Sequence, residues 1–330
     1  MKSITQQRLA ELANVSVSTV SKAFANSNEI SEKTRNRIFE LAKEYGCFAK
    51  YYSGTPTTKV IAVIANEIKE NVYTKGLKHL DKIIRQDGNV MLVAYSNYSQ
   101  QTRQYLMDYF TTYAKVDGLI VFSSLKELTV SNLDIPIVAF SSKSSAQNKQ
   151  IADRIVWDMN TITDNAISYL MQNGHTDIAY VGEFLSKSKR ELFKTVMQKH
   201  NLPVPEEFVR TSRLRLEEAG YSEMKELLSL PKRPTAIFCA YDTIAHGVIS
   251  CIKDSGFSVP DEFSVISMDN IDTSAMGYNL TTFQKVDISF YDMAYELLLK
   301  RMDNPYIPKQ TIMASPRFVE RGSVRNLRGL

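Results

Sequence analysis

From residue 60 onward the chain alternates short apolar runs with stretches of helical periodicity. The first run, Val60–Ile64, is continuous and β-branched, which is typical of a strand buried on both faces of a sheet. We predict further strands at residues 90–94, 118–122, 135–140, 178–182, 236–240, 263–268 and 280–283. Helices are expected between them, at about residues 73–86, 101–113, 162–172, 189–200, 243–255 and 288–301. The alternation therefore predicts an α/β fold with parallel sheets covered by helices.

Two similar units of this alternation follow one another, which predicts two lobes with a cleft between them. Ligands of such sheets bind where the strands end at their carboxyl edge. Polar side chains stand at these predicted ends: Asn66, Glu67, Ser141, Ser142, Asp242, Asp269 and Asn270, with Arg190 opening a helix. Carboxylates, amides and an arginine suit a polyhydroxylated or otherwise polar small molecule, although Asp242 and Asn270 fit helix caps or loop residues equally well.

The N-terminal segment has a different pattern, that of two short helices joined by a tight turn. Leu9, Leu12 and Ala13 give the first helix one buried stripe. This helix is expected to end at Asn14, which tolerates the left-handed conformation that a sharp turn needs. Ser16 is a good N-cap for the second helix. The segment reads as a helix-turn-helix unit.

The second of these helices has an inner and an outer face. Val20, Ala23 and Phe24 form the inner stripe. Small polar residues and one cation point outward, namely Val17, Ser18, Ser21 and Lys22. A small face allows close approach to base edges and phosphates. A third helix is expected after Ser31, buried through Ile38, Leu41 and Ala42. The spacing fits a DNA-binding unit, and it also fits a generic three-helix bundle.

Charge favours the first of these two interpretations. Residues 1–54 hold eight Lys/Arg against five Asp/Glu, an excess of three within a chain whose formal net charge is +4. Positive charge gathered in a small N-terminal unit is the electrostatic footprint of a phosphate binder.

Length and composition exclude several classes of protein. A chain of 330 residues predicts two or three domains, and no apolar run approaches a membrane span. Met1 and Lys2 lead directly into a capped helix, so we expect no signal peptide and a cytoplasmic protein. Three scattered cysteines and four isolated histidines give no disulfide framework, metal site or catalytic group. With no glycine-rich phosphate loop and no nucleophile elbow either, we expect no enzyme, no metal and no cofactor.

Several ordered motifs together resemble the LacI/GalR family of bacterial repressors over essentially the full length. Residues 9–22 (LAELANVSVSTVSK) are similar to the family signature AxxAGVSxxTVSR. Further similar segments are 116–120 (VDGLI), 173–182 (NGHTDIAYVG), 234–238 (PTAIF), 259–266 (VPDEFSVI), 280–282 (LTT) and 318–321 (FVER).

The resemblance implies a helix-turn-helix head, a hinge and a two-lobed body like a periplasmic binding protein. The corresponding ranges are the head at 1–47, the hinge at 48–58, and the body at 59–330, with lobe 1 at about 59–156 plus 287–313 and lobe 2 at about 157–286 plus 314–330. It also implies a homodimer on double-stranded operator DNA, without a membrane. By position, the DNA-binding residues are Thr5, Ser16, Val17, Ser18, Thr19, Ser21, Lys22, Asn26, Ser31, Thr34 and Tyr51. The effector-binding residues are Asn66, Tyr73, Ser141, Arg190, Asp242 and Asp269.

Departures from the family pattern concern the hinge and the effector. The hinge lacks the leucine that wedges into the minor groove, and residues 48–55 (FAKYYSGT) stand there instead. Tyr51 or Tyr52 could act as the wedge, or both could pack on the head or body. Phe193 and Tyr241 replace a usual glycine and asparagine, so the pattern leaves the effector open.

We therefore expect a cytoplasmic repressor of carbohydrate-utilisation genes, controlled by a sugar or sugar phosphate bound between the lobes. The alternatives are a purine-type corepressor-dependent regulator, a solute-binding protein without a regulatory role, and a sugar-metabolising enzyme. For the dimer contact we expect the helix near Tyr73–Leu80 and the helix after Asp242. The apolar residues of the latter helix fit a lobe core equally well: Ile244, Val248, Cys251 and Ile252.

Overall fold

The computed structural model describes residues 4–25, 27–51, 58–68, 71–114, 116–123, 135–141, 152–271, 279–284 and 287–329. The chain forms two compact units, a head at Met1–Lys59 and a body at Val60–Leu330. Within the described parts, no helix is long and apolar enough to cross a membrane.

Hydroxyl caps define where the helices of the head begin. Its described helices are α1 (Gln6–Ala13), α2 (Val17–Phe24), α3 (Glu32–Glu44) and the short α4 (Phe48–Tyr51). The side chains of Thr5, Ser16 and Ser31 each accept a backbone N–H three residues later, at 3.0–3.2 Å. Asn14 ends α1 with φ at 52°, the left-handed turn that the sequence predicts. Both predicted caps, at Ser16 and Ser31, are thereby confirmed.

The core of the head is small and aromatic. Val20, Ala23 and Phe24 are buried, as predicted for the inner face of α2. Phe48 of α4 packs edge-on against Phe24, with ring centroids 6.0 Å apart. The residues at the start of the expected hinge therefore belong to the packing of the head.

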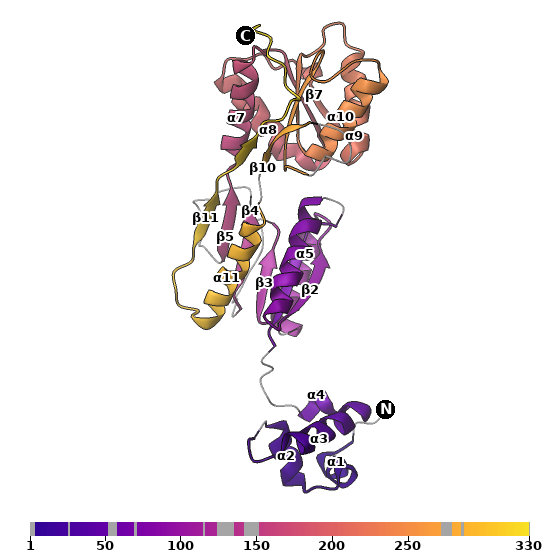
Figure 1. The fold of residues 1–330 in the computed structure, drawn as a ribbon, viewed down its shortest axis with the longest axis vertical. Helices are drawn as coiled ribbons and strands as arrows, with labels where there is room; N and C mark the ends of the chain where they lie inside the picture. Colours follow the sequence, from indigo (N-terminus) through magenta and orange to yellow (C-terminus); the bar gives the residue numbers. More distant parts are fainter. Residues whose placement is uncertain are drawn as a thin grey trace. The chain divides into compact units, whose positions relative to one another are not determined.

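Lobe 1 is a parallel sheet (Figure 1). Its strands are β1 (Val60–Ala65), β2 (Val90–Tyr95), β3 (Gly118–Val121), β4 (Ile137–Ser141), β5 (Asp153–Trp157) and β11 (Thr311–Ala314), in the order β11-β5-β4-β3-β1-β2. The helices of this lobe are α5 (Asn71–Gln86), α6 (Gln100–Asp108), the π-helix η1 (Tyr109–Tyr113) and α11 (Ser289–Asp303). Every described strand pair is parallel, so the carboxyl ends of the strands share one edge.

Lobe 2 repeats the arrangement with one antiparallel strand. Its strands are β6 (Ile178–Glu183), β7 (Val209–Ser212), β8 (Ala236–Cys239), β9 (Ser264–Met268), β10 (Thr281–Gln284) and β12 (Arg317–Val319), in the order β12-β10-β9-β8-β6-β7. The helices are α7 (Met159–Gln172), α8 (Lys187–Lys199), α9 (Leu216–Leu228) and α10 (Asp242–Asp254), with 3-10 turns η2 (Phe184–Ser186) and η3 (Glu206–Phe208). Only β12, which pairs with β10, runs antiparallel among the described pairs. The fold class that the sequence predicts is confirmed.

The sequence pattern misses several elements. Strand β7 and helix α9 lie in a stretch rich in charged residues for which the pattern predicts no element. Strands β5, β11 and β12 are not predicted either, and β12 is only three residues long. The helix predicted at 101–113 divides into α6 and the π-helical η1. At this change the hydroxyl of Thr111 donates to the carbonyl oxygen of Met107 at 2.9 Å, a side-chain bond that competes with the backbone ladder.

The apolar face of helix α10 belongs to the core of lobe 2, the second of the two alternatives that the sequence left open. Its apolar residues are all buried in the core of the lobe: Ile244, Val248, Cys251 and Ile252. The helix that covers them is α9, the element that the sequence pattern missed. Two glycines allow this contact: a Cβ at Gly220 would lie 2.0 Å from the carbonyl oxygen of Ile244, and one at Gly247 would lie 1.9 Å from that of Glu217.

We expect Gly247→Ala to lower the free energy of unfolding by about 1–3 kcal/mol, because the added methyl forces α9 and α10 apart. Gly322→Ala is the matched control, since the nearest atom to a Cβ there is 3.8 Å away. Urea unfolding followed by circular dichroism measures both variants. Equal midpoints for the two would show that the helices do not need this close approach.

Candidate functional site

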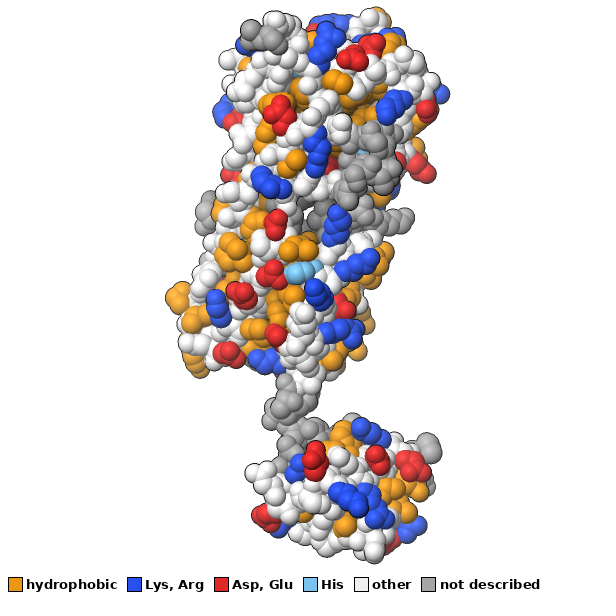
Figure 2. Space-filling view, in the orientation of Figure 1, with side chains coloured by type: hydrophobic (Ala, Val, Ile, Leu, Met, Phe, Trp, Pro, Cys, Tyr) orange, Lys and Arg blue, Asp and Glu red, His pale blue; other side chains and the backbone are white. Residues whose placement is uncertain are grey.

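The exposed face of α2 is the first candidate site. Val17, Ser18, Ser21 and Lys22 are all exposed, and Val17 presents 44% of its surface to solvent. Apart from Lys22, the side chains of this face are small. On the face of the head visible in Figure 2, basic and acidic side chains are interspersed. Because Lys22 is the one charged residue among these four, recognition by the outer face of α2 would depend on particular side chains rather than on a broad positive field.

Lys22 has an acidic partner on the head. Its Nζ lies 2.5 Å from Oε2 of Glu29, and both side chains are exposed. The hydrogen bond from Lys22, and then its charge, lower the pKa of Glu29. Because exposed ion pairs contribute little, Lys22 can exchange Glu29 for a phosphate or a base at small cost.

Most other predicted DNA-binding residues of the head are helix caps or their partners. The hydroxyls of Thr5, Ser16 and Ser31 accept backbone N–H groups, and each can still donate. Thr19 and Thr34 lie 2.8 Å from the capping hydroxyls of Ser16 and Ser31. Asn26 lies outside the described residues.

Tyr51 packs on the head, which is the second of the two placements that the sequence allowed. Its hydroxyl donates to the carbonyl oxygen of Ile4 at 2.8 Å, and its ring lies 5.9 Å from that of Phe24. A role as a DNA wedge would require both contacts to break. Tyr52 lies outside the described residues.

In lobe 1 the candidate residues stand at strand ends, where Asn66 joins three neighbouring strands. Its Nδ2 donates to the carbonyl oxygen of Phe122 after β3, at 3.0 Å. Its Oδ1 accepts from the hydroxyl of Ser96 after β2, at 3.2 Å. Ser141 is buried at the end of β4. The side chain of Tyr73 lies outside the described residues.

In lobe 2 the carboxylate of Asp242 is enclosed by its own lobe. One oxygen accepts from the hydroxyls of Ser267 and Thr282, and the other accepts from the N–H of Ile271 at 2.8 Å. Burial, and then the charge of Asp269, raise the pKa of Asp242 to about 6. These bonds tie α10, β9 and β10 together beside the strand ends.

Arg190 and Asp269 are not joined by any described hydrogen bond. The guanidinium of Arg190 pairs instead with the adjacent Glu191, at 2.8 Å. Asp269 is buried after β9 with φ at 135°, a backbone region that side chains rarely adopt. Both residues lie in lobe 2 after strands β6 and β9.

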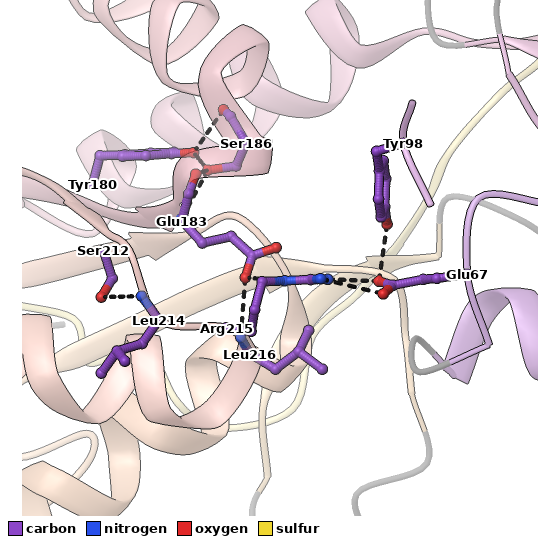
Figure 3. A network of polar contacts seen from close by, with 9 residues as sticks. All are labelled: Glu67, Tyr98, Tyr180, Glu183, Ser186, Ser212, Leu214, Arg215 and Leu216. Atoms are coloured by element: carbon purple, nitrogen blue, oxygen red, sulfur yellow. Dashed lines mark hydrogen bonds and ion pairs between the residues drawn. The ribbon is translucent and has the colours of Figure 1, made fainter. Parts of the chain in front are cut away.

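A charged network between the lobes was missed by the sequence analysis (Figure 3). Nη2 of Arg215 lies 2.5 Å from Oε1 of Glu67, and Nη1 lies 3.2 Å from Oε2 of the same carboxylate. Nε donates to Oε2 of Glu183 at 2.8 Å. Glu67 follows β1 in lobe 1, whereas in lobe 2 Glu183 is the last residue of β6 and Arg215 follows β7. The network therefore brings the strand ends of both lobes together.

The surroundings of Arg215 favour its charge. Burial opposes the charged form, but the hydrogen bonds that Arg215 donates to Glu67 and the charges of both glutamates raise the pKa of Arg215. The hydroxyl of Tyr98 also donates to Oε1 of Glu67, at 3.0 Å. Glu67 stands at a predicted strand end, whereas no predicted element adjoins Arg215, because the pattern indicates neither β7 nor α9. No group of His, Cys, Asp and Glu in the described ranges could hold a metal ion.

The raised pKa of Asp242 predicts a pH dependence of stability. A folded-state pKa above the unfolded value means that the folded protein binds the proton more tightly. The contribution is fully present below about pH 4 and is lost as the pH rises through about 6. Relative to Asp242→Asn, the wild type should lose about 3 kcal/mol of unfolding free energy between these limits.

Asp242→Asn retains an oxygen for the N–H of Ile271, and the two hydroxyls can turn to accept from its amide. Urea unfolding between pH 4 and 7 measures the difference, with the exposed Glu207→Gln as control. Parallel pH curves for wild type and Asp242→Asn would contradict the assignment.

Comparison with known proteins gives two family matches. A model described as bacterial regulatory proteins, lacI family, matches residues 7–47. A model described as a periplasmic binding protein-like domain matches residues 167–324. The first match covers the helix-turn-helix unit, and the second covers most of lobe 2.

Similar proteins extend these matches over the whole chain. The HTH-type transcriptional repressor PurR of Actinobacillus pleuropneumoniae is 30% identical over 340 residues, covering 98% of this chain and 99% of that protein. The lac repressor dimer bound to operator and the anti-inducer ONPF has a TM-score of 0.74 at 18% identity, covering 98% of this chain and 100% of that chain. A LacI family regulator from Enterococcus faecium with bound ribose has a TM-score of 0.68 at 22% identity, covering 82% of this chain and 100% of that chain.

Proposed function

This chain belongs to the LacI family of bacterial regulatory proteins, and we propose from its site residues how it contacts DNA and what kind of molecule controls it. It is a DNA-binding transcriptional repressor with an effector-binding body, and it acts on operator DNA as a homodimer. We place its action in the cytoplasm, where the operator lies, and we assign it no catalytic step.

The observation that carries the DNA-binding role is the capped turn that presents α2. Asn14 and Ser16 fix the angle between α1 and α2, and the outward face of α2 is small enough to enter the major groove. Val17, Ser18 and Lys22 are the side chains that we assign to base edges. The hydroxyls of Thr5 and Ser31 are assigned to phosphates together with the other predicted head residues: Ser16, Thr19, Ser21, Asn26 and Thr34.

Lys22→Ala should weaken operator binding by roughly 1–3 kcal/mol and relax the preference at one base position in each half-site. Lys43→Ala is the control, because it removes the same charge from the last turn of α3. Fluorescence anisotropy on the operator and on its single-base variants measures both effects. Uniform weakening on all sequences would assign Lys22 to the DNA backbone instead.

Lobe 1 offers a surface for the second subunit. Strand β2 is the edge strand of its sheet, and Val90, Leu92 and Val93 are exposed along it. Exposed apolar residues on an edge strand are a liability unless another surface covers them. We propose that the homodimer contact includes β2 and the neighbouring α5, in place of the buried α10.

Leu92→Lys should convert the dimer to a monomer at micromolar concentration, because it places a charge in an apolar contact. Met313→Lys is the matched control: Met313 is 50% exposed on β11, the opposite edge of the same sheet, whereas Leu92 is 40% exposed. Sedimentation velocity distinguishes the two states. A dimer that withstands Leu92→Lys but not Met313→Lys would move the contact to the other edge.

We assign the effector to the strand ends where the lobes meet, with a sugar or sugar phosphate as the expected class. The strand-end residues Asn66, Ser141, Arg190 and Asp269 supply donors and acceptors suited to hydroxyl groups. A regulator with the same fold was solved with bound ribose, which supports a saccharide, and the relative named PurR keeps a purine as the second candidate.

Footprinting upstream of the protein's own gene, with and without sugars, sugar phosphates and purines, tests the whole function. A protected site that changes with one class of ligand supports the proposal. Ligand binding without any protected DNA would point to a solute-binding protein.

A further inference from the structure

We propose that Arg215 is the anion-binding residue of the effector site, and that Glu67 occupies it as an internal substitute when no effector is bound. The effector is accordingly an anionic saccharide, a sugar acid or a sugar phosphate. This inference rests on the proposed function and narrows its ligand class.

The geometry of the Arg215–Glu67 pair is that of a ligand contact. Two guanidinium nitrogens meet two oxygens of one carboxylate, at 2.5 and 3.2 Å. This paired arrangement is the one with which arginine recognises carboxylates and phosphates. A carboxylate or phosphate of a bound ligand can take the place of Glu67 with the same hydrogen bonds.

Contacts within lobe 2, and one with Tyr98 of lobe 1, orient the guanidinium of Arg215 for that exchange. Its Nε bonds to the fully buried Glu183, whose same oxygen accepts the N–H of Leu216 at 3.1 Å. Leu216 adopts φ at 54°, so the backbone after Arg215 is in a region that leucine rarely occupies. The guanidinium also lies 5.7 Å from the ring centroid of Tyr98. These contacts fix the fork of Nη1 and Nη2 toward lobe 1, as Figure 3 shows.

Acids at the same strand ends largely balance the cations beside Arg215. Residues 183–191, at and after the end of β6, contain Lys187, Lys189 and Arg190 together with Glu183 and Glu191. Residues 213–218, after β7, contain Arg213 and Arg215 together with Glu217 and Glu218. The preference for an anion therefore comes from the paired nitrogens of Arg215 rather than from a broad positive field.

Exchange at Arg215 would also couple binding to the contact between the lobes. Glu67 belongs to lobe 1, so its displacement removes a direct bond between the lobes and replaces it with the ligand. The hydroxyl of Tyr98, which donates to Glu67 at 3.0 Å, remains available to the released carboxylate. Binding thus changes the lobe contact without leaving the carboxylate of Glu67 unpaired.

Isothermal titration calorimetry on the full-length protein tests the inference with matched probes. The pairs are D-glucuronate and D-glucose 6-phosphate against D-glucose, and ribose 5-phosphate against ribose. The wild type should bind an acid or a phosphate at least about tenfold more tightly than its neutral parent. Comparing glucuronate with the two sugar phosphates shows whether the preferred anionic group is a carboxylate or a phosphate.

Three variants test which residues cause the preference for an anionic over a neutral sugar. Arg215→Gln should weaken the preferred anion by at least about tenfold and leave the neutral sugar unchanged, whereas Arg215→Lys should keep part of the preference. Glu67→Gln should tighten the anion severalfold, because it removes the competing charge. Arg210→Gln is the matched control: Arg210 pairs with Glu223 at 3.0 Å within lobe 2 and should leave binding unchanged.

Two results would overturn the inference. One is equal binding of neutral and anionic probes, unaffected by Arg215→Gln. The other is the absence of anion binding in both wild type and Glu67→Gln. In either case operator binding, measured by anisotropy on the same samples, decides separately whether the proposed function stands. Circular dichroism confirms that each variant is folded.

Discussion

Parallel strand pairing is the constraint on which both the body and its site depend. In each lobe the central parallel strands are buried, and polar side chains gather where the strands end. Glu67, Glu183 and Arg215 occupy three such ends, and the hydrogen bonds between them join the lobes. The direction of the strands therefore sets the position of the site, and the side chains at the strand ends set its chemistry.

Buried charges fix the two lobes internally, at opposite edges of their sheets. In lobe 2 the carboxylate of Asp242, beside the carboxyl ends of the strands, accepts three hydrogen bonds, from β9, β10 and the loop after β9. In lobe 1 the buried Arg301 of α11 bonds to Asp153 at the start of β5, at 2.9 Å. Both groups are fully used by their own lobe, because a buried charge without partners is costly. Arg215 differs from them because its strongest partner belongs to the other lobe.

The sequence predicts the elements whose signal is local. Continuous apolar runs located β1 and most other strands, and the hydroxyls of Ser16 and Ser31 located helix starts within one residue. It does not predict α9, because its segment is rich in charged residues and its burial depends on close packing against α10 at two glycines that are 27 residues apart. For the same reason the apolar face of α10 could be assigned either to a dimer contact or to a lobe core.

Contacts between segments that are far apart in the sequence determine the features that the sequence pattern does not predict. Glu67 and Arg215 are 148 residues apart, and neither matched a pattern that would pair them. Their pairing also explains how an arginine can lie at this position without a ligand. If an anion binds there, it meets a guanidinium that is already half-buried and oriented, so little further ordering is required. Glu67 orients the guanidinium of Arg215 before an anion binds. When the anion displaces Glu67, the bond between the lobes is lost, so binding changes how the lobes are placed relative to each other.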